Sequence, residues 1–160
     1  MPLEIERKFL VFGDAWKEQS EDAVYLRQGY LNIEKQCSVR VRTDGHSGWL
    51  NIKGVTIGAQ RREFEYEIPV KEAEELLQYF STGPLIEKRR YFVRSGRHIW
   101  EIDVFEGENR GLVVAEIELE DPDEDFERPN WLGAEVTHDA RYYNTHLARK
   151  PYLSWDLSPE

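Results

Sequence analysis

The stretch Glu4-Ile5-Glu6-Arg7-Lys8-Phe9-Leu10-Val11 places the charged Glu4, Glu6 and Lys8 at alternate positions, and the apolar Ile5, Phe9 and Val11 fall on the positions of opposite parity. Successive side chains of a β-strand point to opposite faces of a sheet, so a spacing of two gathers residues on one face. The first charged residues would share one face, and the apolar Ile5, Phe9 and Val11 would share the other. This stretch therefore predicts a strand with one charged and one apolar face.

The same alternation recurs along the chain and predicts about eight strands. They are Glu4–Val11, Val24–Leu31, Ser38–Arg42, Trp49–Lys53, Arg62–Val70, Glu87–Val93, Ile99–Phe105 and Val113–Glu120. Turn residues at 43–48 and 95–97 predict hairpins, so most neighbouring strands should pair antiparallel. Helical spacing appears at Lys71–Phe80 and at His138–Leu147, the second after Thr137 as a possible cap, and a shorter turn is expected near Asp14–Glu18.

Length and composition are those of a folded protein of ordinary domain size. The chain has 160 residues, 40% of them hydrophobic, which is enough to bury a core. We expect residues 1–160 to form a single domain of the α+β class, mainly β. The charged N-terminus differs from a signal sequence, and the apolar runs are too short to cross a membrane. We therefore expect a cytoplasmic protein with no membrane partner.

Charge and cysteine content narrow the possible partners. The net charge of −10 argues against a nucleic-acid groove, which needs a broad excess of Lys and Arg. A small phosphorylated ligand remains compatible, because a local basic cluster beside metal-binding carboxylates can hold an anion. The single cysteine, Cys37, excludes an internal disulfide and a cysteine-based zinc site. The oligomeric state is left open.

One face of the predicted strands is almost entirely charged. It carries Glu4, Glu6, Lys8, Arg40, Arg42, Lys53, Glu63, Glu65, Glu67, Lys88, Arg90, Glu101, Asp103, Glu116, Glu118 and Glu120. This face could simply be in contact with water, as is common for antiparallel sheets. However, single strands tend to repeat one sign of charge, and neighbouring like charges disfavour each other. A bound anion and bound cations would relieve this repulsion, and eight strands can close around one small ligand.

An ordered series of segments resembles the CYTH family, also called the triphosphate tunnel metalloenzymes. The opening Glu4–Lys8 has the family's E-x-E-x-K form, which alone would be a weak indication. The further matches are Leu26–Leu31, Val39–Arg42, Ile52–Lys53, Glu65–Glu67, Glu87–Tyr91, Glu101–Phe105, Glu116–Glu118 and the closing segment Glu135–Asn144. The likeness runs from residue 4 to about residue 148 and indicates the short bacterial type of inorganic triphosphatase.

The resemblance implies a closed eight-stranded antiparallel β-barrel, a tunnel with its charged side chains inside. The outer apolar face would need covering helices, which Lys71–Phe80 and His138–Leu147 could supply. By resemblance, the metal ligands are Glu4, Glu6, Glu116 and Glu118, with Glu65, Glu67 and Asp103 as further ligands or supporting groups. The substrate would be held by Lys8, Arg40, Arg42, Lys53, Lys88 and Arg90, with Arg141 reaching in from the closing segment.

The resemblance also implies the chemistry. Carboxylate ligands without Cys or His favour Mg²⁺ or Mn²⁺, and two ions are expected. Candidates for the catalytic step are Tyr30, Lys8 and Lys88, although Tyr30 could equally be a packed aromatic of the barrel. The expected reaction is metal-dependent hydrolysis of the terminal phosphate of a linear triphosphate, with inorganic tripolyphosphate as the expected substrate.

Other functions stay open at this point. Thiamine triphosphatases, class IV adenylate cyclases and RNA triphosphatases share the implied tunnel and differ in what lies beyond it. A protein that binds polyphosphate or nucleotide without turnover is a second class, and a structural sheet with a solvated polar face is a third. The acidic run Glu72-Ala73-Glu74-Glu75 is interpreted as a solvated helix surface outside any site.

Overall fold

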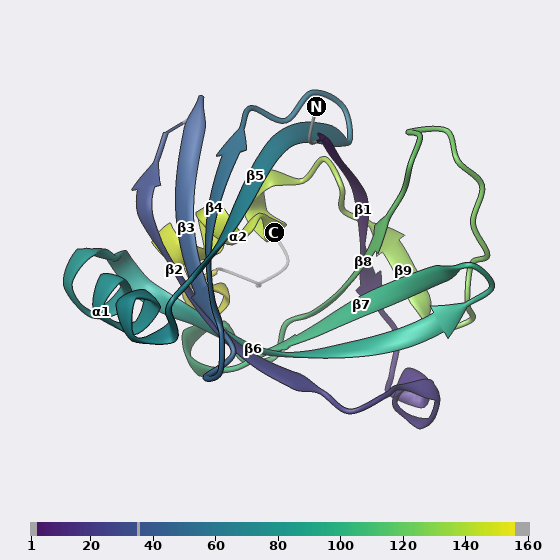
Figure 1. The fold of residues 1–160 in the computed structure, drawn as a ribbon. Coiled ribbons are helices and arrows are strands. Elements are labelled where there is room, and N and C mark those ends of the chain that lie inside the picture. The colour runs from purple at the N-terminus through teal and green to yellow at the C-terminus, as the bar shows by residue number, and fades with distance from the viewer. Residues whose placement is uncertain (1–2, 35, 156–160) are drawn as a thin grey trace.

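The computed structural model of the chain describes residues 3–34 and 36–155. Its strands form one antiparallel sheet in the order β5-β4-β3-β2-β6-β7-β8-β1-β9, and a pairing of β5 with β1 closes eight of them into a barrel (Figure 1). The strands are β1 Leu3–Val11, β2 Val24–Ile33, β3 Cys37–Thr43, β4 Gly48–Gly54, β5 Gln60–Ile68, β6 Thr82–Ser95, β7 His98–Phe105, β8 Val113–Glu118 and β9 Leu132–Glu135. The predicted eight-stranded barrel is confirmed, and β9 is an addition that the sequence did not predict.

Helix α1, Val70–Phe80, confirms the helix predicted at Lys71–Phe80 and covers the outside of the barrel. Its buried residues Ala73 and Leu77 pack with Val41 of β3. The helix comes so close to β4 that a Cβ on Gly48 would lie 2.6 Å from the Cβ of Ala73. In the described part of the chain, no helix is long and apolar enough to cross a membrane.

Helix α2 begins later than predicted. It spans Asn144–Arg149, whereas helical spacing placed a helix at His138–Leu147 with Thr137 as its cap. That prediction is wrong because the Thr137 hydroxyl has a distant partner: its Oγ1 accepts from the backbone N–H of Lys8 at 3.0 Å. The chain beyond Thr137 then makes a short 3-10 turn, η3, at Ala140–Tyr142 before α2 starts.

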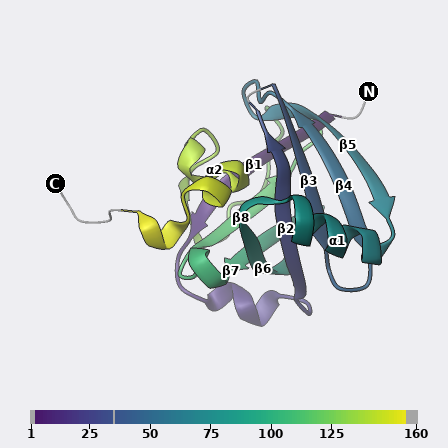
Figure 2. The same cartoon turned by 90° about the vertical axis from the view of Figure 1, so that its left-hand side faces the viewer.

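Helix α2 lies at one end of the barrel instead of covering its outer face (Figure 2). Its Leu147 and Ala148 pack with Tyr30, Ile86 and Val114, which project from the ends of β2, β6 and β8. The expectation that this helix covers the apolar outer wall is therefore wrong. It closes an end of the barrel with an apolar layer.

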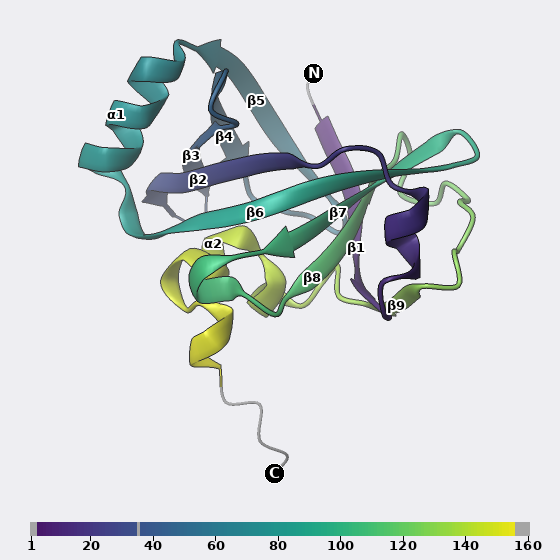
Figure 3. The ribbon, with the colours of Figure 1, turned by 90° about the horizontal axis from the view of Figure 1, so that it is seen from below.

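The second apolar area of the outer wall is covered by irregular segments. The purple turn η1, Ala15–Gln19, lies on the outside of the barrel near β1 and β9 (Figure 3). Its Trp16, together with Trp131, which precedes β9, is buried in one cluster with Phe9 and Trp100. The Trp100 and Trp131 rings meet edge to face with centroids 5.6 Å apart. The short turn expected near Asp14–Glu18 is thus confirmed, and it contributes a tryptophan to the core. Two further 3-10 turns, η2 at Gly107–Asn109 and η4 at Tyr152–Ser154, lie elsewhere in the chain.

Strand β1 changes partners along one of its edges. Among the residues that the structure describes, Leu3, Glu4 and Ile5 pair with β5, and from Phe9 onward the same edge pairs with β9. Its other edge pairs with β8 from Glu6 to Leu10. Within residues 3–34 and 36–155, the seam that closes the barrel therefore has three residue pairs.

Candidate active site

The strand register turns the charged faces toward the inside of the barrel. Across β1 and β8, Glu6 lies opposite Glu118 and Lys8 lies opposite Glu116. Lys88 is 0% exposed and Lys8 is 7% exposed, which fits a barrel interior and does not fit a sheet face in water. The structure therefore excludes the alternative of a solvated charged face.

The glutamates of β1 and β8 form an acidic wall, defined here as Glu4, Glu6, Glu116 and Glu118. Burial, with Glu116 and Glu4 nearby, raises the pKa of Glu6 well above its usual value. Partial burial, with Glu4 and Glu63 nearby, also raises the pKa of Glu118. Both shifts reflect the repulsion of confined carboxylates. A cation placed among them would be stabilised.

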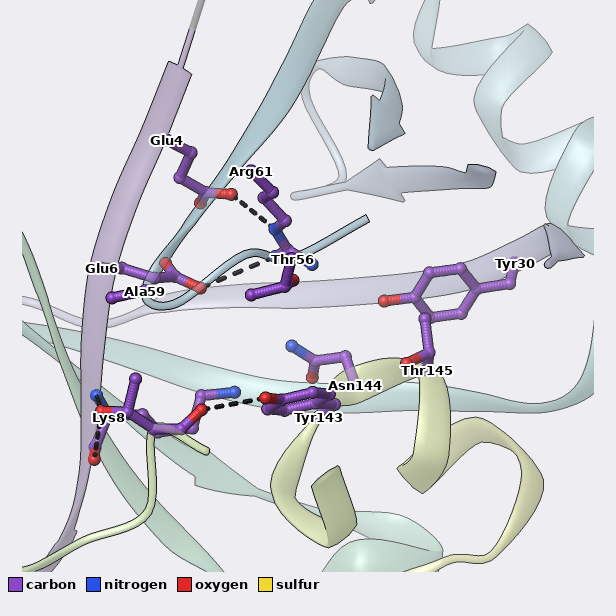
Figure 4. Close-up of a pocket in the computed structure, with 11 residues that line it drawn as sticks. Glu4, Glu6, Lys8, Tyr30, Thr56, Ala59, Arg61, Tyr143, Asn144 and Thr145 are labelled. Atoms are coloured by element: carbon purple, nitrogen blue, oxygen red, sulfur yellow. Dashed lines mark hydrogen bonds and ion pairs between the residues drawn. The ribbon is translucent and has the colours of Figure 1, made fainter. Parts of the chain in front are cut away.

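Arg61, near the start of β5, joins the two glutamates of β1. Its Nε donates to Glu4 at 2.9 Å, and its Nη2 lies 3.6 Å from Glu6 (Figure 4). Although burial opposes it, the cations around Glu4 lower the pKa of this carboxyl far below its usual value. Sequence analysis missed Arg61 because the predicted strand began at Arg62. Arg61 lies two residues before Glu63, so extending the alternating pattern backward from Glu63 would have found it.

The wall opposite β8 carries the arginines of β3. Arg42 lies 3.7 Å from Glu65, which is itself partly exposed. Burial, with Arg40 and Arg90 close by, lowers the pKa of Arg42 to about 10. Within the described residues, the Nε atoms of Arg40 and Arg42 are buried and have no acceptor. Strand β3 therefore presents donors suited to an anion.

A tight ion cluster links β6 and β7. Lys88 Nζ donates to Asp103 at 2.7 Å, and Arg90 donates to both carboxylate oxygens of Asp103 at 2.8 and 3.0 Å. Arg90 also donates to Glu101 at 2.8 Å. Although burial opposes it, Arg90 and Lys88 lower the pKa of Asp103 well below its usual value, and burial lowers the pKa of Lys88 to about 8. Asp103 already orients two cations and fits a supporting role better than direct metal ligation.

Two further lysines are held by inward carboxylates. Lys53 Nζ lies 3.1 Å from Glu63, and burial lowers the pKa of Lys53 to about 8. Lys8 Nζ lies 3.4 Å from Glu116 and donates to the carbonyl of Tyr142 at 3.1 Å. Although burial opposes it, Lys8 lowers the pKa of Glu116 to about 2. Each lysine therefore has a carboxylate partner that a bound phosphate would have to replace.

A small cavity of about 40 Å³ lies between the acidic wall and the segment that leads into α2. The Tyr30 hydroxyl points toward this space (Figure 4). The cavity is lined by Glu4, Glu6, Lys8, Tyr30, Thr56, Ala59, Arg61, Thr137, Tyr143, Asn144 and Thr145. A second, more open cavity of about 380 Å³ lies beside Glu101 and Glu118. The smaller one has room for a water molecule or so, so a larger ligand must displace existing ion pairs.

Two of the predicted site residues lie apart from this group. The Arg141 side chain is 60% exposed and pairs with Asp139 at 2.6 Å. Glu67 is exposed on β5, six residues beyond Arg61, which is about 20 Å along a strand. The structure does not bring either of them to the acidic wall, and their roles in binding stay predictions.

Two buried amides face the interior and were not predicted as site residues. Gln28 and Asn51 are both 0% exposed. The Asn51 Nδ2 donates to Glu65 at 2.7 Å. Strand parity points to both positions, because Gln28 shares a face with Tyr30 and Asn51 shares one with Lys53. A search restricted to charged residues left them out.

The donor set of the acidic wall fits a divalent cation. Among the residues that the structure describes, no three acidic or histidine side chains already converge as a metal site. The four glutamates nevertheless offer only carboxylate oxygens, which Mg²⁺ and Mn²⁺ prefer. The raised pKa values of Glu6 and Glu118 show that this wall gains from added positive charge.

Comparisons with known proteins agree with this geometry. A family model described as "CYTH domain" matches residues 2–152. The chain is 50% identical over 155 residues to the inorganic triphosphatase of Acetivibrio thermocellus, covering 97% of this chain and 99% of that protein. It is 38% identical over 152 residues to the inorganic triphosphatase of Nitrosomonas europaea, covering 91% and 96%. A crystal structure of an inorganic triphosphatase superposes with a TM-score of 0.63 at 37% identity, covering 90% of this chain and 96% of that one.

Proposed function

Since the chain belongs to the CYTH domain family, we propose that it is an inorganic triphosphatase that hydrolyses the terminal phosphate of tripolyphosphate with the help of divalent metal ions. Relatives of that name align with this chain over more than nine tenths of its length. An enzyme of this kind needs alignment and charge neutralisation more than covalent help from the protein. The interior of this barrel offers both.

The observation that carries the proposal is the division of the interior into two facing walls. In the closed strand order, β8 lies across the barrel from β3, and β1 lies across from β2. The glutamates of β1 and β8 therefore stand on one side, and Arg40 and Arg42, whose Nε atoms are buried, stand on the other. A linear polyanion accompanied by cations has the same division of charge, and fits between these walls.

We assign the acidic wall to two Mg²⁺ or Mn²⁺ ions. Bound there, the ions would neutralise phosphate charge and lower the pKa of a coordinated water. Before metal can bind, the glutamates of the acidic wall must release the basic side chains that now pair with them. Arg61 now joins Glu4 and Glu6, and Lys8 pairs with Glu116. Phosphate oxygens would give these cations new acceptors while the carboxylates bind metal.

The basic residues then hold the substrate. Arg40 and Arg42 can donate to its oxygens, the guanidiniums by paired contacts and the lysines as point charges. In hydrolysis the water oxygen bonds to the terminal phosphorus while the bridging P–O bond breaks and pyrophosphate leaves. We assign Lys8 and Lys88 to the negative charge that develops on the transferred and leaving groups, and Tyr30 to orienting the water or the terminal phosphate. Lys53 and Arg90 are the remaining basic residues that we assign to substrate binding.

We further propose that the protein acts in the cytoplasm as a single domain on a small free substrate. The net charge of −10 supports a small ligand over nucleic acid. Glu65, Glu67 and Arg141 would serve nearer the openings of the barrel, where the structure leaves them more exposed.

One panel of assays tests the function. Phosphate release is measured from tripolyphosphate, ATP and thiamine triphosphate, each with Mg²⁺, with Mn²⁺ or with excess chelator. We expect tripolyphosphate to be turned over fastest, and only with metal. Faster release from ATP or thiamine triphosphate would replace the substrate assignment. Tight binding of tripolyphosphate with no release from any substrate would identify a binding protein.

A further inference from the structure

We propose that Gln28 contacts the substrate directly, its side-chain amide donating to a phosphate oxygen beside Arg42. The proposal rests on tripolyphosphate as the ligand of the proposed function. Gln28 lies on β2, opposite Arg42 of β3 on one side and Ile86 of β6 on the other. Its side chain is 0% exposed. Within the described residues, neither its Nε2 nor its Oε1 has a hydrogen-bond partner.

Three donors that have no partner among the described residues lie together on β2 and β3. They are the Nε2 of Gln28 and the Nε atoms of Arg40 and Arg42, all buried. Directly opposed side chains of an antiparallel pair are neighbours, and Arg40 is one diagonal step from Gln28. Buried polar groups in folded proteins normally have partners, so this concentration of free donors points to a ligand that supplies acceptors. Phosphate oxygens are acceptors only.

Other polar side chains of the interior differ from Gln28 in this respect. Asn51 already donates its Nδ2 to Glu65 at 2.7 Å. Arg90 donates to Asp103 and Glu101 at 2.8 Å each. Those donors have protein acceptors, whereas the Nε2 of Gln28 and the Nε atoms of Arg40 and Arg42 have none among the residues that the structure describes. The contrast locates the anion beside Gln28.

The position of β2 in the barrel determines which oxygens of the substrate Gln28 would contact. In the closed strand order β2 is four places from β1 in either direction, so it faces the strand that carries Glu4 and Glu6. A chain of phosphates bound to metal ions on the acidic wall would turn its remaining oxygens toward β2 and β3. The amide of Gln28 can donate to one of these oxygens, and its carbonyl can accept from water that accompanies the bound anion.

A buried glutamine whose amide has no partner among the described residues also has a cost to stability. An apolar side chain of similar shape at this position would remove two buried unpaired groups. Gln28→Met should therefore leave the ligand-free protein as stable as the wild type or more stable. It should weaken substrate binding at the same time. A glutamine that only fills space would give the reverse pattern.

The test compares Gln28→Met with Leu26→Met, which places the same side chain two residues earlier on the same face of β2. Leu26 is a buried apolar residue that lies opposite Lys88 of β6, and its side chain has no polar group to lose. The melting temperature of each protein, stripped of divalent ions and dialysed, is measured with and without tripolyphosphate. KM and kcat for tripolyphosphate are then measured with Mg²⁺.

We expect Gln28→Met to keep or raise the ligand-free melting temperature, to lose at least half of the tripolyphosphate-induced rise, and to raise KM about tenfold, roughly 1.4 kcal/mol of binding. Leu26→Met should keep both values near those of the wild type. A lower ligand-free melting temperature with an unchanged tripolyphosphate-induced rise would overturn the proposal.

Gln28→Glu is the second variant. Its carboxylate beside two arginines should stabilise the ligand-free protein and abolish the tripolyphosphate-induced rise in melting temperature. A preserved rise would also overturn the proposal. If the wild type binds tripolyphosphate but does not hydrolyse it, the proposed activity fails, and the melting data still decide the role of Gln28.

Discussion

The glutamates of the acidic wall inside the barrel differ from the glutamates on the outer surface of α1. Inside, Glu6 lies opposite Glu118, and both pKa values are raised by confinement and by neighbouring carboxylates. On α1, Glu72, Glu74 and Glu75 are exposed. Glu74 makes a 3.7 Å contact with Arg27 while its side chain is 48% exposed. The inner glutamates are confined and repel one another, whereas the glutamates of α1 are solvated. The inner group is therefore the one suited to bind a cation.

The largest expected effect comes from removing metal. With excess chelator, turnover of tripolyphosphate should fall about a thousandfold or more, which corresponds to about 4 kcal/mol of barrier. The reason is that the acidic wall offers only hard oxygen ligands. Phosphate release is followed as Mg²⁺ or Mn²⁺ is added back. Undiminished turnover in chelator would show that the two glutamate regions do not differ in function.

Removing one inner charge should have the next largest effect. Glu6→Gln or Glu118→Gln keeps the shape of the side chain and loses the charge that holds a cation, so turnover should fall about a hundredfold, about 2.7 kcal/mol. The metal-free variants should be as stable as the wild type or more stable, because fewer carboxylates repel each other. Steady-state rates across a Mg²⁺ titration and melting curves give both values. A normal rate at every Mg²⁺ concentration would contradict the tunnel interpretation.

The arginines of β3 are expected to show a smaller effect, mainly on binding. Arg40→Ala and Arg42→Ala should each raise KM about tenfold, because each removes a charge-assisted donor to phosphate. The fold should remain, since the two arginines repel each other without an anion. KM and the ligand-free melting temperature are the measurements. Unfolding of either variant, with normal affinity in the folded fraction, would make these arginines structural.

The smallest effect is expected on α1. Glu74→Gln changes an exposed glutamate whose ion pair is loose, so stability should change by less than about 0.5 kcal/mol and turnover by less than about twofold. It is assayed beside Glu6→Gln and Glu118→Gln as the matched outer control. A large loss of turnover in Glu74→Gln would mean that charge in general, and not confinement, sets the activity.

Strand positions and faces could be predicted from the sequence because side-chain alternation is a local property. The pattern around Glu4–Val11 gave both the strand and its inward face, and the family resemblance supplied the closure of the barrel. Helix α1 was also predicted from local spacing. These elements depend on neighbours close in sequence.

Contacts between distant residues explain what could not be predicted. Thr137 is held by Lys8, 129 residues away, so the predicted cap does not form. Strand β9 has four residues and pairs with β1, which no local alternation indicates. Parity placed Gln28 inside, but only the structure shows which inward groups have partners. The role of Arg61 required both its inward position and its distances to Glu4 and Glu6.

The short seam between β1 and β5 has a consequence for local motion. In the part of the chain that the structure describes, three residue pairs close this part of the wall, and the contact between Glu4 and Arg61 bridges the same place. Regions with few contacts open at lower free energy than the whole protein unfolds, and their amides exchange with solvent hydrogen sooner. The amides of β1 that face β5 should therefore exchange faster than those between β6 and β7. Because a bound polyanion would draw Arg61 away from Glu4, the exchange rate at this seam should report whether the barrel is occupied.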